Sequence, residues 1–120
     1  PLNLSAEEWL ALLTDPEIVD EFGRRMMAFV YSQPNYQSIA TEIAEALGGV
    51  SYQKITAVNR GIAKRIYKKL GIVPPNNTEG GLRWWNALFD GNPEFYFNDK
   101  GYFIWRLRPV VVEALARSGV

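Results

Sequence analysis

The sequence contains no cysteine and no histidine. Their absence removes thiol and imidazole nucleophiles, the usual zinc ligands and the commonest general base. We therefore expect no catalytic site, metal or cofactor in this chain. A protein without cysteine is compatible with the cytoplasm, the compartment we expect, although exported proteins can also lack disulfides.

Long apolar runs are missing as well. No run approaches the roughly 20 residues that span a bilayer, and the N-terminus lacks the basic segment and apolar run of a signal peptide. We expect a soluble chain with no membrane partner. Its 120 residues, 48% of them apolar, are enough for one buried core, so residues 1–120 are expected to form a single domain. Because the first residue is Pro1 and not Met, this domain is expected to be a fragment of a longer protein.

Acidic residues are absent from one long stretch, residues 51–78, although the formal net charge of the chain is zero. That stretch carries six Lys and Arg residues. Residues 1–50 carry eight acidic residues against two basic ones, a balance of −6. The neutral total therefore hides a cationic segment beside an acidic one, and such a segment predicts a basic face on the molecule.

Residues 1–33 predict two N-terminal helices. Ser5 and Glu8 have the spacing of a capping box at the start of the first. Asp15 as N-cap, with Pro16 at the first helical position, predicts the start of the second.

Residues 36–71 predict a helix-turn-helix. The first of its helices ends at Gly48 and Gly49, and Ser51 caps a second helix that stops at Gly71. Two helices joined by a short turn that contains glycine are typical of this motif.

The periodicity changes in residues 82–107, where aromatic and β-branched residues alternate with turn formers. This pattern predicts a β wing: two antiparallel strands joined by a loop over residues 90–101, with room for a third short strand. Residues 108–119 predict a C-terminal helix. The expected fold is α+β, a winged helix with extra N-terminal helices and a C-terminal helix.

The predicted helix after Ser51 has an apolar face and an opposite face that is polar at first and cationic farther along. This gradient is typical of a recognition helix in the major groove. We expect base edges to be read by Tyr52, Gln53, Thr56, Ala57 and Arg60. We expect phosphate contacts from Tyr36, Ser51, Lys54, Lys64, Lys68 and, in the wing, Lys100.

Each of these features also has a structural interpretation. Basic residues on an amphipathic helix are often only its solvated side, but such sides usually mix both signs of charge. Asn59, at the edge of the apolar stripe, fits a structural hydrogen bond as well as a base contact. Strand aromatics mostly form core, yet a pocket for a flipped or modified base is the alternative for Trp84, Trp85, Tyr96 and Trp105.

A metal nuclease is not predicted. Asp90, Glu94, Asp99 and Lys100 superficially resemble the carboxylates and lysine of such a site, but the carboxylate-x-lysine element is missing. Acidic residues in a hairpin are normally turn formers.

Four segments carry a family resemblance: "YQSIATEIAEALGG", "SYQKITAVNRGIAKRIYKKLGI", "RWWNALFDG" and "YFIWRLRPVVVEALARSG". Together they resemble the winged-helix domain found beside HNH nuclease domains in bacterial restriction endonucleases. The resemblance implies a DNA sensor, in some members for methylated bases including methylated adenine. With no histidine, this chain cannot contain the HNH site, so the resemblance places the nuclease elsewhere in the polypeptide. A weaker similarity to DNA alkyltransferases fails, because their Pro-Cys-His-Arg motif has no counterpart.

The leading expectation is sequence- or modification-specific binding of double-stranded DNA, with N6-methyladenine favoured over 5-methylcytosine, for a linked restriction nuclease. One alternative is a winged-helix transcription regulator, which predicts a homodimer and a palindromic site. Another is a protein interaction module that docks an acidic partner on the basic helix.

Overall fold

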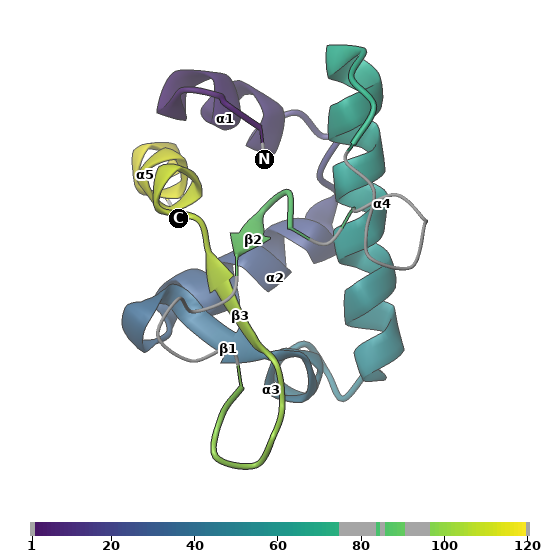
Figure 1. Ribbon diagram of the computed structural model, residues 1–120, viewed down its shortest axis with the longest axis vertical. Coiled ribbons are helices and arrows are strands. Elements are labelled where there is room, and N and C mark those ends of the chain that lie inside the picture. The colour runs from purple at the N-terminus through teal and green to yellow at the C-terminus, as the bar shows by residue number, and fades with distance from the viewer. Residues whose placement is uncertain (1, 75–83, 85, 91–96, 120) are drawn as a thin grey trace.

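Figure 1 shows the computed structural model of the chain, which describes residues 2–74, 84, 86–90 and 97–119. The described part contains five α-helices and one antiparallel sheet of three short strands, so the fold class is α+β as predicted. None of its helices is both long and apolar enough to cross a membrane. Nor do the described residues include a group of acidic side chains placed to hold a metal ion.

The first helix, α1 (Ala6–Leu13), begins as predicted. The Glu8 backbone N–H donates to Ser5 Oγ at 3.2 Å, and the Ser5 N–H donates to Glu8 Oε1 at 3.0 Å, which completes the capping box. The buried side of α1 packs against the C-terminal helix α5 (Pro109–Ser118). The two ends of the chain therefore lie on the same side of the molecule (Figure 1).

The second helix, α2 (Glu21–Ser32), starts later than predicted. Its N-cap is Asp20, whose Oδ1 accepts a hydrogen bond from the Gly23 N–H at 2.9 Å. The prediction of a start at Asp15 is wrong because residues 15–19 form a turn that buries Ile18 and Val19 in the core. Asp20, five residues after Asp15, is the N-cap that the helix uses instead.

The segment after α2 also differs from the prediction. The prediction of a helix start near Tyr36 is wrong. A short 3-10 turn, η1 (Pro34–Tyr36), leads into a strand, β1 (Gln37–Ile39). The helix α3 (Ala40–Ala46) starts only after this strand. The backbone of β1 is held by strand pairing, with Ile39 opposite Ile104. A pairing between segments so far apart in the chain overrides local helical periodicity.

The sheet has the order β1-β3-β2, so that β3 (Ile104–Leu107) is the central strand. The edge strand β2 is only Phe89–Asp90, shorter than the predicted strand over 82–89, because residues 86–88 form a turn. The second predicted strand, over 101–107, is likewise shortened to β3. The third strand of the described sheet is β1, which precedes α3, whereas residues 91–96 of the predicted wing loop lie outside the described residues.

The longest helix, α4 (Tyr52–Leu70, 19 residues), has both predicted ends. Ser51 caps its start and Gly71 ends it in the left-handed conformation, with φ +68°. Its inner face is buried as predicted, through Ile55, Ile62 and Ile66. Asn59 is also inside, 1% exposed, which excludes the base contact and leaves the structural role.

Gly23 of α2 lies directly against Ile62 of α4. A Cβ at that position would lie 2.9 Å from Ile62 Cδ1 and 3.2 Å from Val19 Cγ1. Both neighbours are buried and have little room to move. Glycine is therefore required here for the approach of the two helices.

We expect Gly23→Ala to lower the free energy of unfolding by about 1 kcal/mol, because overpacking costs about 1–3 kcal/mol and a helical alanine regains up to about 1 kcal/mol. Ile62→Val removes the clashing Cδ1, so it should cost less in the Gly23→Ala background than in the wild type. Gly61→Ala in α4 is the matched control, since its added methyl would meet only the Arg65 guanidinium, with Nη1 at 3.1 Å, and no buried side chain. Chemical denaturation of Gly23→Ala, Ile62→Val, their double variant and Gly61→Ala measures the free energy of unfolding of each. Equal losses of stability for Gly23→Ala and Gly61→Ala would contradict the close contact at Gly23.

Candidate nucleic-acid interface

The outer face of α4 presents the residues predicted to read bases. All five are solvent-exposed: Tyr52, Gln53, Thr56, Ala57 and Arg60. They occupy the first half of the helix, whose N-terminus lies at the same end of the molecule as α3 and the hairpin before β3 (Figure 1). Their spacing along the helix places them on its outer face.

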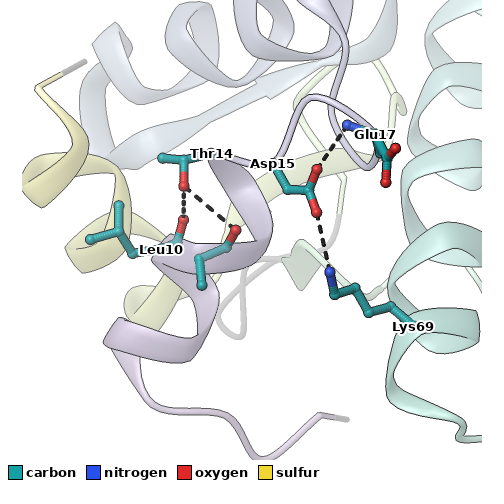
Figure 2. Close-up of polar contacts among 6 residues, drawn as sticks. Leu10, Thr14, Asp15, Glu17 and Lys69 are labelled. Carbon is teal, nitrogen blue, oxygen red and sulfur yellow. Dashed lines mark hydrogen bonds and ion pairs between the residues drawn. The ribbon is translucent and has the colours of Figure 1, made fainter.

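Two of the six cations of α4 hold the helix to the rest of the protein. Arg65 Nε donates to the Ile18 carbonyl oxygen at 2.8 Å, and Lys69 Nζ lies 3.3 Å from Asp15 Oδ2. Figure 2 shows Asp15 between its two partners, the Glu17 backbone N–H and Lys69. These contacts fasten the second half of α4 to the turn between α1 and α2. Arg65 and Lys69 therefore contribute to the fold first.

Two further cations lie over aromatic rings. Lys54 Nζ is 5.1 Å from the centroid of the Phe22 ring, and Lys64 Nζ is 5.6 Å from that of Trp84. Such contacts are weak at exposed sites, about 0.5–1 kcal/mol. Both ammonium groups remain exposed at the surface of α4 and can contact an anion while their stems stay in place.

Arg60 and Lys68 complete the cationic face. Within the part of the chain that the structure describes, neither makes a hydrogen bond, ion pair or ring contact, and both are exposed. Four of the six cations, Lys54, Arg60, Lys64 and Lys68, thus remain accessible along α4. We call these four the cationic face.

The other predicted phosphate residues are distributed unequally. Ser51 Oγ accepts the Lys54 backbone N–H at 3.3 Å, and thus caps α4. Lys100 is exposed in the hairpin turn before β3. Tyr36 is the last residue of η1, just before β1, with φ +54° and its ring centroid 5.4 Å from that of Tyr31 in α2.

A groove lies between α4, the start of α3 and the hairpin. Its volume is about 430 Å³, and its lining residues are Ile39, Ala40, Thr41, Tyr52, Thr56, Tyr102, Phe103 and Trp105. None of them is charged. Thr56 Oγ1 donates to the Tyr52 carbonyl oxygen at 3.3 Å, so the hydroxyl hydrogen is already used within the helix. The groove is therefore a largely apolar surface that includes Tyr52 and Thr56 and adjoins the other residues predicted to read bases.

The tryptophans predicted to form a base pocket do not share one site. Trp105 is 9% exposed, lines the groove and packs edge-on against Phe89, with ring centroids 5.2 Å apart. Trp84 belongs to another cluster, where it meets the edge of Tyr67 at 5.8 Å. Trp85 and Tyr96 lie outside the described residues.

Arg106, a basic residue of the central strand β3, has a structural partner. Arg106 makes a bidentate ion pair with Asp90, with distances of 3.0 and 3.1 Å between β3 and β2. The pair is half-buried and ties the edge strand to the central one. Arg106 is therefore unsuited to reach a phosphate.

Sequence reasoning missed most of the groove. Ile39, Ala40 and Thr41 fall in a segment predicted as a helix, and Tyr102 and Phe103 in a predicted strand whose aromatic residues fit either a core or a base pocket. The β-branched and aromatic residues around position 39 were the available signal for a strand at this place. Without the pairing of β1 with β3, however, nothing in the sequence brings these two segments together.

Comparison with families of proteins, with curated proteins and with solved structures gives no match. Functional inference for this chain therefore depends on the geometry of the described residues and on the resemblance of its motifs.

The ion pair of Asp15 predicts a pH dependence of stability. The hydrogen bond from the Glu17 N–H, and then Lys69, lower the pKa of Asp15 below its ordinary value of 3.8. A carboxyl whose pKa is lower in the folded state stabilises the fold above its unfolded pKa, and this contribution is lost as the pH falls through the folded value. We expect Asp15→Asn, which can still accept the Glu17 N–H, to lower the Tm slightly at neutral pH and to match the wild type in acid.

Thermal unfolding across a pH series measures this difference. Lys69→Gln should show the same trend, because it removes the same pair from the other side. A Tm difference that persists unchanged below the pKa of Asp15 would contradict the assignment.

Proposed function

We propose that this chain is a winged-helix domain that binds double-stranded DNA, with α4 as recognition helix and the hairpin before β3 as wing. The elements from α2 to β3 follow the order helix, strand, helix, turn, helix, strand, strand, and the first strand pairs beside the last. That order is the one expected for a winged helix. The longest helix then presents its outer face beside the wing.

The cationic face of α4 is the observation that carries this proposal. Over its 19 residues α4 has no carboxylate, and four cations stay accessible after the fold has used two. Backbone phosphates are the ligand that such a row fits. The neighbouring α3 carries exposed Glu42 and Glu45, which repel phosphate. DNA is therefore expected to lie along α4 and the hairpin, and not along α3.

The apolar groove supports a preference for methylated DNA. A methyl group on a base edge in the major groove would leave water on entering a surface lined by Thr56, Tyr102 and Trp105. The geometry accommodates an added methyl but does not choose the base. The resemblance of the sequence motifs is what favours N6-methyladenine over 5-methylcytosine, and what suggests an HNH restriction nuclease in the same polypeptide.

Substitution of the cationic face tests DNA binding. We expect Arg60→Gln with Lys68→Gln to weaken binding at least tenfold and to reduce the slope of log affinity against log salt by about one to two, because each phosphate contact contributes about 0.9. The matched control is Arg65→Gln with Lys69→Gln, which removes the same charge from the same helix. It should lower the Tm with a smaller effect on the slope. Equal slopes for both double variants, measured by fluorescence anisotropy, would contradict the proposal.

Comparison of modified duplexes tests methyl sensing. Burial of one methyl group is worth about 0.8 kcal/mol, so we expect the preferred methylated duplex to bind about fourfold more tightly than the unmodified one. Tyr102→Ser should remove this preference, whereas Tyr102→Phe should keep it, because the ring and not the hydroxyl lines the groove. Titrations with N6-methyladenine, 5-methylcytosine and unmodified duplexes of one sequence measure the preference. Equal affinity of the wild type for all three would exclude it.

A further inference from the structure

A row of aromatic rings follows one face of the hairpin from the core to its tip. Phe103 and Trp105 are two residues apart, so both point to the same face, and Phe97 joins them because it pairs with Phe103 across the hairpin. The rings of Phe97 and Phe103 meet edge-on at 5.7 Å, as those of Phe89 and Trp105 do at 5.2 Å. Exposure rises along the row, from the buried Phe89 to Phe97 at 58%.

The tip that carries Phe97 is held in a defined shape. Asn98 Oδ1 accepts backbone N–H groups of Lys100 at 3.0 Å and Tyr102 at 2.9 Å. The Asn98 N–H donates to the Tyr102 carbonyl oxygen at 2.8 Å, and Gly101 supplies the positive φ of +83° that the turn requires. Phe97 is therefore an exposed apolar ring on a preorganised support, and its insertion into a partner would cost little ordering.

The charge of the hairpin tip does not explain how the tip would bind DNA. Asp99 and Lys100 stand side by side in the turn, and their charges cancel. Attraction to phosphate must therefore come from the cationic face of α4, whereas the tip offers Phe97. The stacked faces of the base pairs are the largest apolar surface of a duplex that a flat ring, brought against it by a charged helix, can contact.

We infer that Phe97 is a wedge that inserts between two base pairs of the duplex, in the minor groove next to the major groove occupied by α4, and bends the DNA. This inference rests on the proposed function, since it requires duplex DNA along α4. Inserted apolar side chains partly unstack a base step and kink DNA by about 20–90°. Pyrimidine–purine steps such as TA and CA/TG unstack most readily, so Phe97 would favour them without a hydrogen bond to any base.

The test measures binding and bending in the same sample. The probe is a duplex enriched from a random-sequence library by the wild-type chain, carrying a donor and an acceptor dye at its two ends. We expect energy transfer to rise when the wild type binds. Phe97→Ser should still bind, about tenfold more weakly, with no rise in energy transfer. Phe97→Leu, which keeps an apolar wedge, should retain the bend.

Ile72→Ser is the matched control. It removes an apolar side chain of similar exposure (49%) just after the C-terminal end of α4, away in the chain from the groove residues and the hairpin, so the bend should persist. A wild-type complex with unbent DNA, or equal bending by Phe97→Ser, would overturn the wedge and leave DNA binding standing. Failure to enrich any duplex would instead overturn the proposed function together with the wedge.

Discussion

The burial of one side of α4 is the constraint on which the rest of the structure depends. The helix is 19 residues long, and its apolar side is closed by α2 at Gly23, where only a hydrogen atom fits between the two elements. This contact fixes the rotation of α4 about its own axis. The direction of each helical side chain follows from that rotation. Packing in the core therefore determines which residues of α4 face solvent.

The distribution of charge follows from the same constraint. With α4 in this orientation, Arg65 and Lys69 lie over the turn between α1 and α2. Arg65 donates a hydrogen bond to the Ile18 carbonyl oxygen there, and Lys69 forms an ion pair with Asp15. The acidic N-terminal segment is therefore in part the internal counter-charge of α4. The remaining cations are exposed at the surface, so the molecule keeps a positively charged face although its net charge is zero. Counting charge by segment identifies the polarity, but only the packing separates structural cations from accessible ones.

Features encoded within a few residues were predictable from the sequence, whereas features that need distant partners were not. The capping box at Ser5, the cap at Ser51 and the stop at Gly71 are local chemistry, and all were confirmed. Strand β1 was missed because three residues carry almost no period, and its extended backbone is held by β3, more than 60 residues away. The groove was missed for the same reason, while the exposed face of α4 followed directly from its helical period.

The pairing of β1 with β3 connects the stability of the sheet to the composition of the groove. Ile39 stands opposite Ile104, which sets the start of α3 beside Phe103 and Trp105. A slip of one residue in the pairing of β3 would turn each of its side chains to the opposite face of the sheet. Trp105 would then lose its contact with Phe89 in the core and its place in the groove. The register that buries the core is thus also the register that lines the surface beside α4. The surface beside α4 is therefore held by the same strand pairing as the core, and a ligand selected by its shape would gain affinity from that preorganisation.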